Sequence, residues 1–591
     1  MPQLRVGLAQ VDLTVGDLGG NVQVVLDNTR QAAAQDVHVV AFPEMTLTGY
    51  PPEDLVLRRS FVEASRTALG RLGQRLADDG LGEIAVVVGY LDASGDPGRD
   101  TPAGRPPGEP QNAAACLYAG RVLTRYGKHH LPNYGVFDEF RYFVPGDRLP
   151  VVRLHGVDVA TTICEDLWQE GGPIAVARRA TVGLVLCLNG SPYEQNKDDF
   201  RLDLVRRRAR EAAAALAYVN LYGGQDELVF EGDSLVVDAA GELVARAPQF
   251  QPGLLVVDLE LPAATDDRVG TVDAGDGTTM TVERVSTATA PVPAYSPITA
   301  GRAPRLSDEA EVYAALVTGT RDYVGKNGFP SVLIALSGGI DSALVATIAA
   351  DAIGPDAVHV VGLPGRWSSD HSLRDAEELA RTQGLHWSVL PIEPMVEAFE
   401  KSLDLHGLAA ENLQARVRAT ILMALSNEHG HLLLTTGNKS ELATGYTTLY
   451  GDSAGGFAPI KDVPKTLVWT LARWRNARAT AAGEPAPIPT ATIAKPPSAE
   501  LAPDQLDSDR LPPYDQLDRL LEDYVGRDLG REELLAAGHD PAVVDRVLAM
   551  VDAAEYKRRQ YPPGPKISLK AFGRDRRVPI TSRWRRQPPR G

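Results

Sequence analysis

Cysteine is scarce in this sequence, with only Cys116, Cys164 and Cys187 among 591 residues. They form no CxxC pair, and so few cysteines suit a reducing compartment. No apolar run approaches the roughly 18 residues that a membrane helix needs. The first residues also lack the basic region and apolar region of a secretory signal. We therefore expect a cytoplasmic protein that does not contact a membrane.

Positive charge is also in short supply, with 60 Lys and Arg against 77 Asp and Glu and a net charge of -17. This balance disfavours a surface that binds nucleic-acid phosphates, so we expect no nucleic-acid partner. One basic stretch, "FGRDRRVPITSRWRRQ" near the C-terminus, is either a ligand contact or a solvated tail. The 44% hydrophobic and 23% charged residues are typical of a soluble globular protein.

The length predicts roughly two to four domains. Residues 263–304 are rich in Thr, Gly, Pro and Asp without sustained periodicity, which indicates a linker or an ordered crossing strap. Before it, residues 1–262 alternate short β-branched runs with helical stretches, a pattern of layered α/β structure. After it, in residues 305–591, "SVLIALS" leads through glycines into a helix and a second strand, the βαβ unit of a parallel sheet. An amphipathic helix is predicted further on by the spacing of Leu413, Val417, Ile421 and Leu425.

Polar residues follow three apolar stretches of the first domain. Glu44 follows "VVAFP", Lys128 follows "LTRYG" and Cys164 follows "VATTI". A lysine can lower a thiol pKa and stabilise an oxyanion, while a glutamate can carry a proton between thiol, leaving amine and water. Any one of the three alone is more often structural. Cys164 poses a further difficulty, because Glu165 directly after it disfavours a thiolate unless a base and a cation reach the sulfur from elsewhere.

Three longer motifs favour the catalytic interpretation. "FPEMTLTGYPPEDL", "YGKHHLPNYGVFDEFRYFVPG" and "TICEDLWQ" together resemble the signature regions of the nitrilase, or carbon–nitrogen hydrolase, superfamily. The resemblance implies an αββα sandwich in which Glu44 is the general base, Lys128 stabilises the oxyanion and Cys164 is the nucleophile. The implied reaction is hydrolysis of an amide through a thioester. The family needs no metal, so we interpret His129 and His130 as loop residues.

The second half contains a glycine loop between an apolar strand and a helix start, where backbone N–H groups favour phosphate. "LIALSGGIDSALVA" is not a Walker A loop, because Lys-Ser/Thr is missing after the second glycine. It resembles instead the pyrophosphate loop of the adenine-nucleotide α-hydrolases, which implies a Rossmann-like parallel sheet and cleavage of ATP between its α and β phosphates. The residues that carry this resemblance are Ser337, Gly338, Gly339, Asp341 and Ser342.

The remaining motifs, "TTGNKSELATGYTTLYGDSAGGFAPIKDVPKT", "KPPSAEL" and "LPPYDQLD", closely resemble those of the glutamine-dependent NAD+ synthetases over nearly the whole chain. The resemblance implies that ammonia from glutamine attacks a deamido-NAD+ adenylate made from ATP. It assigns Asp341 and Glu441 to Mg2+, and it adds to the ATP site Arg416, Thr436, Lys465 and Ser498. Deamido-NAD+ would be held by Asn412, Asp452 and Lys461, and glutamine by Tyr50, Tyr134, Glu165, Trp168, Ser191 and Lys197. Glu165 would then bind the α-ammonium of glutamine. The family also implies a homo-oligomer, at least a dimer and possibly an octamer.

Other classes share parts of this pattern. Guanine- or asparagine-type amidotransferases share the ATP loop but use a different glutaminase. A tRNA thiolase or lysidine-type enzyme also shares the loop, and it would be supported by a basic face or paired cysteines, neither of which is evident. A nucleotide-sensing scaffold with an inactive amidase is disfavoured, because Glu44, Lys128 and Cys164 are all present.

Overall fold

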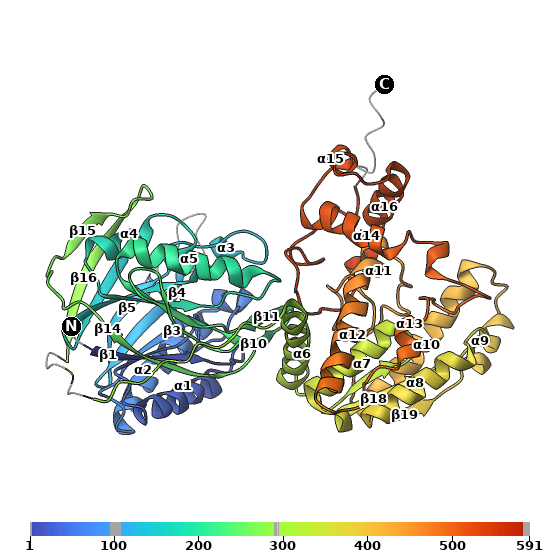
Figure 1. Ribbon diagram of the computed structural model, residues 1–591, viewed down its shortest axis with the longest axis horizontal. Helices are drawn as coiled ribbons and strands as arrows, with labels where there is room; N and C mark the ends of the chain where they lie inside the picture. The colour runs from blue at the N-terminus through green and yellow to red at the C-terminus, as the bar shows by residue number, and fades with distance from the viewer. Residues whose placement is uncertain (1–2, 95–107, 289–291, 293–294, 583–591) are drawn as a thin grey trace. The chain divides into compact units, whose positions relative to one another are not determined.

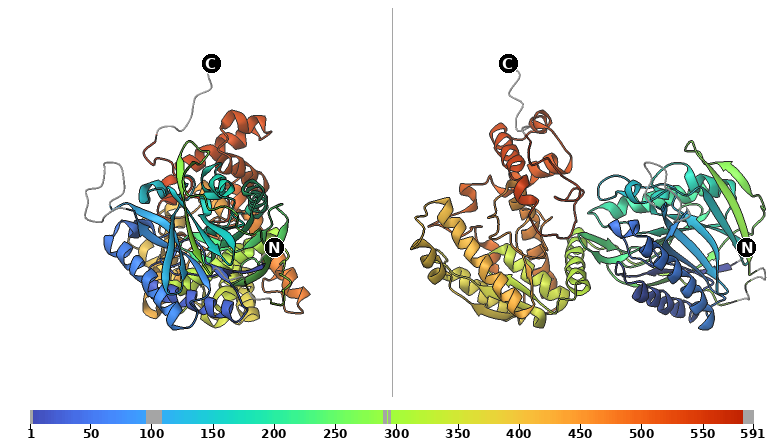
Figure 2. Two further views of the ribbon diagram at one scale, coloured as in Figure 1. Left: turned by 90° about the vertical axis from the view of Figure 1, so that its left-hand side faces the viewer. Right: turned by 180° about the vertical axis from the view of Figure 1, so that it is seen from behind.

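A computed structural model describes residues 3–94, 108–288, 292 and 295–582 of the chain (Figures 1 and 2). The last nine residues, which include the end of the basic C-terminal stretch, lie outside the described residues. The chain divides into two compact units. Unit 1 comprises Met1–Gln225 and Phe230–Leu306, and unit 2 comprises Asp226–Val229 and Ser307–Gly591.

Unit 1 is built on two β-sheets. One has six strands in the order β14-β1-β2-β3-β4-β5, and the other has eight in the order β13-β12-β9-β8-β7-β6-β16-β15. The strands are β1 (Gln3–Gln10), β2 (Val39–Ala41), β3 (Ala85–Ala93), β4 (Pro110–Tyr118), β5 (Arg121–Gly127), β6 (Arg148–Leu154), β7 (Val157–Ile163), β8 (Leu184–Asn189), β9 (Ala215–Asn220), β12 (Leu235–Val237), β13 (Leu243–Arg246), β14 (Gly253–Glu260), β15 (Gly270–Asp273) and β16 (Thr279–Thr287). A separate hairpin consists of β10 (Tyr222–Gln225) and β11 (Leu228–Glu231).

Helices cover the outer faces of these two sheets (Figure 1). Helices α1 (Leu18–Ala33) and α2 (Arg59–Asp78) pack on the six-stranded sheet, and α4 (Gly172–Arg179) and α5 (Lys197–Ala212) pack on the eight-stranded sheet. A sheet covered on both faces needs strands that are apolar throughout, and every residue of "LVLCLN" in β8 is buried. The predicted αββα sandwich is therefore confirmed.

The segment predicted as a linker or an ordered crossing strap, residues 263–304, contains two strands of the eight-stranded sheet. β15 pairs antiparallel with β16, and β16 pairs in parallel with β6 along its whole length. The prediction is wrong for these strands, because the Thr-rich composition masked an alternation in β16. Met280 and Val282 point into the core, whereas Thr279 and Thr281 lie on the other face.

Unit 2 contains a parallel sheet of four strands in the order β19-β18-β17-β20, as the βαβ pattern predicts. The strands are β17 (Val332–Ala335), β18 (Val358–Gly362), β19 (His386–Val389) and β20 (Leu432–Leu434). The helices are α6 (Asp308–Lys326), α7 (Ile340–Ile353), α8 (Asp370–Gln383), α9 (Glu393–Glu400), α10 (Leu408–His429), α11 (Lys439–Thr444), α12 (Lys465–Ala481), α13 (Thr490–Ala494), α14 (Tyr514–Leu521), α15 (Arg531–Ala536), α16 (Pro541–Ala553) and α17 (Glu555–Arg558). The predicted amphipathic face of α10 packs with Leu333 and Leu433 of the sheet. Because the strands are parallel, the loops after β17 and β20 leave the same edge of the sheet.

The three cysteines are all free and buried. Among the described residues, no helix is both long enough and apolar enough to cross a membrane.

Candidate active sites

The Cys164 thiol lies at the end of β7, on the first residue of a short 3-10 helix, Cys164–Leu167. Its φ of 43° places it in the left-handed region, which a non-glycine residue adopts at a cost and which is frequent at active sites. Asp166 fixes this turn, because its carboxylate accepts hydrogen bonds from the backbone N–H of Ile163 at 2.9 Å and from the Tyr126 hydroxyl at 2.5 Å. The side chain of Cys164 is only 4% exposed.

Glu44 and Lys128 form a buried ion pair. Lys128 Nζ lies 2.8 Å from Glu44 Oε1 and 2.9 Å from Glu139, which comes from the single-turn helix α3 (Glu139–Tyr142). Two further hydrogen bonds hold the Glu44 carboxylate: Oε1 accepts from Asn112 Nδ2 at 2.6 Å, and Oε2 accepts from the Gly190 N–H at 2.8 Å. A carboxylate positioned in this way can accept a proton with little rearrangement.

Burial dominates the electrostatics of this cluster. It raises the pKa of the Cys164 thiol well above the ordinary value, and Glu44 and Glu165 raise it further, while Lys128 opposes them. Burial alone would lower the pKa of Lys128, but Glu139 and Glu44 raise it well above the ordinary value. The thiol is therefore protonated and the lysine is charged. The expected lowering of the thiol pKa by lysine is outweighed, so the sulfur needs a base, and Glu44 is placed to be that base.

Three of the residues predicted to bind glutamine are connected to this cluster by hydrogen bonds or by the chain. The Tyr50 hydroxyl donates to Glu139 Oε1 at 3.2 Å, and the Tyr134 hydroxyl donates to Glu165 Oε2 at 2.8 Å. Ser191 follows the glycine that donates to Glu44, and its own N–H donates to Asn220 at 3.0 Å.

Two further residues of the predicted glutamine site differ in their surroundings. Lys197 Nζ donates to the carbonyl of Pro192 at 3.1 Å, and burial lowers the pKa of this lysine. Trp168 is partly buried and packs against the hydrophobic core of unit 1.

Glu139 and Asn112 belong to the site, yet sequence reasoning missed both. Glu139 is buried and receives hydrogen bonds or ion pairs from Lys128 and Tyr50, and burial raises its pKa to about 7. The available signal was its place in the motif "YGVFDEF", where an acid stands among aromatic residues. Asn112 offered no comparable signal, because it lies inside β4.

The second site is a cavity of about 700 Å³ in unit 2. It opens above the parallel sheet where β17, β18 and β20 end. Its lining includes most of the predicted residues: Ser337, Gly339, Asp341, Ser342, Asn412, Arg416, Thr436, Glu441, Asp452, Lys465 and Ser498. This volume is in the range of sites that hold a nucleotide-sized ligand.

The glycine loop after β17 is shaped by local contacts. Gly338 has a φ of 80°, and a Cβ there would lie 2.1 Å from the carbonyl oxygen of Ser372, so only glycine fits. The Ser342 hydroxyl donates to the Gly339 carbonyl at 3.0 Å, and the Ser337 N–H donates back to Ser342 Oγ at 3.3 Å. The loop therefore leads directly into the first turn of α7, whose N–H groups favour phosphate.

Two acids of this cavity share one lysine. Lys465 Nζ pairs with Asp341 and lies 3.4 Å from Glu441 Oε1. Burial raises the pKa of Glu441 to about 8, against the opposing effect of Lys465. Asn438 Nδ2 also donates to Asp341 Oδ1 at 2.9 Å. An arrangement of two carboxylates beside phosphate-binding N–H groups fits a hard divalent cation, because such an ion takes oxygen ligands from protein and phosphate together.

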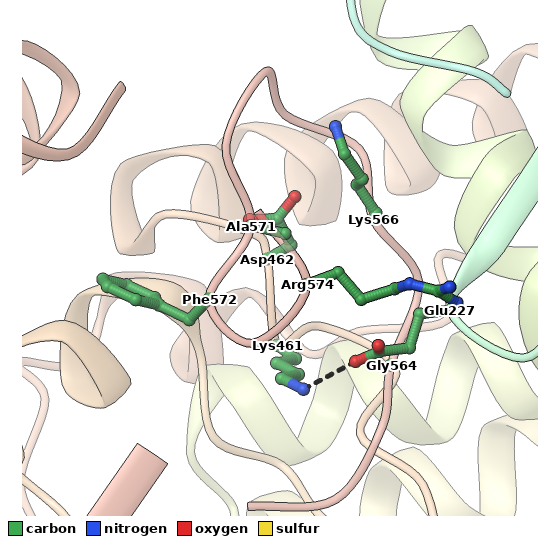
Figure 3. A pocket seen from close by; sticks show the side chains of 8 residues that line it. All are labelled: Glu227, Lys461, Asp462, Gly564, Lys566, Ala571, Phe572 and Arg574. Carbon is green, nitrogen blue, oxygen red and sulfur yellow. Dashed lines mark hydrogen bonds and ion pairs between the residues drawn. The ribbon is translucent and has the colours of Figure 1, made fainter. Parts of the chain in front are cut away.

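Lys461 lies apart from the predicted ligand cavity. Its ammonium pairs with Glu227 at 2.9 Å, and both line a small separate cavity with Asp462, Lys566 and Arg574 (Figure 3). The structure thus does not bring Lys461 together with Asn412 and Asp452, the other residues predicted to hold deamido-NAD+.

Sequence reasoning also missed three residues that line the large cavity, namely Lys495, Asp507 and Arg418. Lys495 Nζ lies 3.3 Å from the carbonyl oxygen of Gly338 and 2.9 Å from Asp375, so it touches the glycine loop itself. It opens the motif "KPPSAEL", which could have drawn attention to it.

Comparison with known proteins gives each unit a family. The carbon–nitrogen hydrolase family matches residues 5–268, and the NAD synthase family matches residues 312–561. The fold and the two sites therefore define an enzyme class in which an amidase of the nitrilase type precedes a nucleotide-binding amidation domain.

Relatives match the full length of the chain. The glutamine-dependent NAD(+) synthetase of Thermotoga maritima is 42% identical over 99% of this chain and 100% of its own length, and that of Aquifex aeolicus is 41% identical over 98% and 100%. Among solved structures, the glutamine-dependent NAD+ synthetase of Acinetobacter baumannii in complex with ADP is 38% identical, covers 98% of both chains and has a TM-score of 0.71. The corresponding protein of Cytophaga hutchinsonii, 22% identical with a TM-score of 0.77, shares the fold. The chain belongs to the family of glutamine-dependent NAD(+) synthetases.

Proposed function

We propose that this enzyme makes NAD+ from deamido-NAD+, ATP and glutamine. Unit 1 hydrolyses glutamine to glutamate and ammonia, and unit 2 uses the ammonia to convert the nicotinic acid carboxylate to an amide, with release of AMP and pyrophosphate. The observation that supports glutamine hydrolysis by unit 1 is the buried ion pair of Glu44 and Lys128 near Cys164, whose backbone has a positive φ. The full-length relatives named above support the two halves acting together.

In the glutaminase reaction, Glu44 takes the proton of the Cys164 thiol as the sulfur attacks the side-chain amide carbon of glutamine. The oxyanion that forms is stabilised by the ammonium of Lys128. Glu44 then gives its proton to the departing nitrogen, the C–N bond breaks, and ammonia leaves a γ-glutamyl thioester. Water, deprotonated by Glu44, hydrolyses the thioester and frees glutamate and the thiol.

Glu165 has a defined part in this scheme. It is adjacent to the nucleophile but bonded to Tyr134, so its carboxylate is held away from the sulfur while remaining in the same site. We assign it to the α-ammonium of glutamine. An acid beside the thiol is then explained by substrate binding, because the charge that raises the thiol pKa is neutralised when glutamine arrives.

In the synthetase reaction, the carboxylate of deamido-NAD+ attacks the α-phosphorus of ATP and pyrophosphate leaves. Ammonia then attacks the acyl carbon of the adenylate, and AMP leaves. The cavity above the parallel sheet supports this assignment, since the glycine loop and the start of α7 suit the departing phosphates. We assign Asn412 and Asp452 to the dinucleotide, whereas the ion pair of Lys461 with Glu227 argues against a direct role for Lys461.

Asp341 and Glu441 would hold Mg2+ together with phosphate oxygens. The ion, when bound, neutralises charge on the triphosphate and makes pyrophosphate a better leaving group. Lys465 pairs with both carboxylates, so it provides positive charge at the same place and orients them toward the cavity.

We further propose that the enzyme works in the cytoplasm as a homo-oligomer, at least a dimer and possibly an octamer. The three free, buried cysteines support a reducing compartment. The oligomeric state rests on the family alone, and sedimentation that gives only monomer at working concentration would contradict it.

Product analysis tests the whole scheme. Deamido-NAD+, ATP, Mg2+ and glutamine should yield NAD+, AMP, pyrophosphate and glutamate in equal amounts, and ADP in place of AMP would refute the assignment of unit 2. Asp341→Ala should abolish NAD+ formation from glutamine and from ammonia alike, because a metal–phosphate contact is lost, while glutamine hydrolysis persists. Normal synthesis in that variant would show that the glycine loop and its acid are structural.

A further inference from the structure

Two imidazoles and a carboxylate converge in unit 1 on a point that the proposed reactions do not use. His129 Nε2 lies 2.9 Å from Asp276 Oδ2, and His130 Nε2 lies 3.1 Å from the same oxygen. Their three ligand atoms lie within 4.8 Å of one another. Over the residues that the structure describes, this is the only group of three or more His, Cys, Asp or Glu side chains close enough to share one ion.

The three side chains come from two distant parts of the sequence. His129 and His130 follow Lys128 at the end of β5, whereas Asp276 lies in the turn between β15 and β16. The side chains of both histidines are 9% exposed, and that of Asp276 is 14% exposed. Gly172 packs directly on the two rings, because a Cβ there would lie 2.3 Å from His130 Cε1. The two rings and the carboxylate are therefore largely buried and held in place, although Asp276 belongs to an exposed turn.

The hydrogen bonds of His129 set its tautomer. Its Nδ1 lies 2.7 Å from the carbonyl oxygen of Gly146, which can only accept, so Nδ1 carries a proton. In the neutral ring Nε2 then has a lone pair, and that lone pair faces the carboxylate of Asp276. Two acceptors at 2.9 Å repel each other unless a cation lies between them or the ring is protonated. A backbone carbonyl on the far nitrogen is also the usual partner of a metal-binding histidine.

His130 also has one buried ring nitrogen, Nδ1, without a hydrogen-bond partner among the described residues, on the side that faces Asp166. The nearest carboxylate oxygen is Asp166 Oδ1 at 3.9 Å, which already accepts the N–H of His130 at 2.9 Å. If Nε2 bound a metal ion, Nδ1 would carry the proton and would point its N–H toward Asp166. A carboxylate, a histidine and a metal in line form a common arrangement around protein-bound zinc.

We propose that His129, His130 and Asp276 form a binding site for a first-row transition metal ion, with Zn2+ as the expected occupant. Imidazole and carboxylate are good ligands for zinc, and three protein ligands leave one position for water. Nitrogen and oxygen ligands about 2.0–2.1 Å from zinc in a tetrahedron lie about 3.4 Å apart. The separations of 2.9 and 3.1 Å between the imidazole nitrogens and Asp276 Oδ2 therefore need to widen by only a few tenths of an ångström, and the two nitrogens lie within 4.8 Å of each other.

The consequence of such an ion would be local order beside the catalytic lysine. It would tie the turn between β15 and β16 to the two residues that follow Lys128. Asp166, which accepts from His130, also holds the turn that carries Cys164. Metal binding itself does not depend on whether the chain makes NAD+, and it can be measured without any assay of activity.

The test is a zinc titration of the full-length chain after treatment with a chelator and dialysis. One equivalent of zinc should bind tightly, as measured by competition with a chromophoric chelator and by elemental analysis. Asp276→Asn and His129→Gln should each weaken this binding by roughly 10- to 100-fold or more, since even the loss of an outer partner has effects of that size. Co2+ bound in place of zinc should give the visible absorption of a tetrahedral site, and both variants should lose it.

Two control variants identify the site. His406→Gln changes an exposed histidine that also pairs with an aspartate, Asp404 at 3.1 Å, and should retain the tight equivalent. Asp341→Asn removes a carboxylate of the expected Mg2+ site and should retain it too. The proposed site is wrong if folded parent protein binds no more zinc than folded Asp276→Asn. It is equally wrong if Asp341→Asn no longer binds the one equivalent of zinc tightly while Asp276→Asn and His129→Gln still do. Circular dichroism establishes the fold of each protein.

Discussion

Lys128 Nζ lies 2.8 Å from Glu44 Oε1, and neither side chain is exposed to solvent. An ion pair without water is costly unless further hydrogen bonds satisfy its atoms, and here Asn112, Glu139 and the Gly190 N–H provide them. Burial raises the pKa of the Cys164 thiol nearby and Glu44 raises it further, so the thiol stays protonated. The nucleophile is thus formed only when its proton passes to Glu44.

The first prediction separates the two reactions through Cys164. Cys164→Ala removes the sulfur that forms the thioester, so NAD+ synthesis with glutamine should fall to background. Ammonium chloride, at a pH where some ammonia is unprotonated, should still support synthesis near the parent rate. The measurement is NAD+ formed per minute with each nitrogen source. Use of glutamine by the variant would contradict the thioester route, and loss of ammonia-dependent synthesis in a folded variant would contradict the separation of the two reactions.

The second prediction concerns Glu139 and pH. Burial raises the pKa of Glu139 to about 7, so the side chain loses its charge as the pH falls through that value. Lys128 then pairs with Glu44 alone, and its ammonium holds more firmly the carboxylate that must receive the thiol proton. The kcat/KM for glutamine should therefore decline below about pH 7. Glu139→Gln should be roughly tenfold less active or worse at pH 8 and should lack this inflection. An unchanged pH profile in the variant would show that another group titrates there.

Glu139 also affects stability, with a definite sign. Its pKa is higher in the folded state than the ordinary 4.5, so the folded state holds the proton more tightly. Its contribution to the free energy of unfolding is full below about pH 4.5 and is lost as the pH rises through about 7. Urea unfolding of the parent and Glu139→Gln between pH 5 and 8 measures this. The difference between the two proteins should change with pH, and a constant difference would refute the raised pKa.

Part of the site in unit 1 could be predicted from the sequence, because its signal lies within short stretches of the chain. Glu44, Lys128 and Cys164 each follow an apolar strand, so a short window reveals a polar residue where a core residue is expected. The structure then brings Lys128 and Glu44 into contact. Glu139 has no such local signal. It becomes buried only because the fold carries its single-turn helix to Lys128, and that contact depends on tertiary structure.

The fold shows the same limit. The parallel sheet of unit 2 follows from one βαβ pattern, because a buried strand, a glycine loop and an apolar helix occur in sequence. The hairpin of β15 and β16 was missed, because the exposed Thr and Glu residues of β16 resemble a loop in composition. The assignment of Lys461 to deamido-NAD+ rests on the family resemblance alone, and no local pattern could show that its partner is Glu227, more than two hundred residues earlier.

The third prediction tests the role of Glu165 in substrate binding. If its carboxylate binds the α-ammonium of glutamine, Glu165→Gln should raise the KM for glutamine by roughly 10- to 100-fold, because the ammonium loses its negatively charged partner. Ammonia-dependent synthesis should not change. Tyr134→Phe removes the hydroxyl that orients this carboxylate and should have a smaller effect in the same direction. A fall in kcat at unchanged KM would indicate instead that Glu165 acts on Cys164.

The fourth prediction concerns the glycine loop of the nucleotide cavity. Gly338→Ala places a methyl group 2.1 Å from the Ser372 carbonyl oxygen, at a φ of 80°, so the loop must move. ATP-dependent synthesis from either nitrogen source should be lost, while glutamine hydrolysis continues. Gly354→Ala is the matched control. Gly354 ends the same helix α7 with a φ of 83°, but a Cβ there meets no atom within 4 Å.

Both substitutions force alanine to a positive φ, which L side chains rarely adopt and which costs roughly 1–3 kcal/mol. Only Gly338→Ala adds the collision with Ser372. Thermal unfolding should therefore show a modest loss of stability for Gly354→Ala with normal synthesis, and a larger loss for Gly338→Ala without synthesis. Equal activity of the two variants would mean that the backbone at Gly338 does not need its close approach to α8. The loop would then tolerate a shift, and the argument that only glycine fits at position 338 would be wrong.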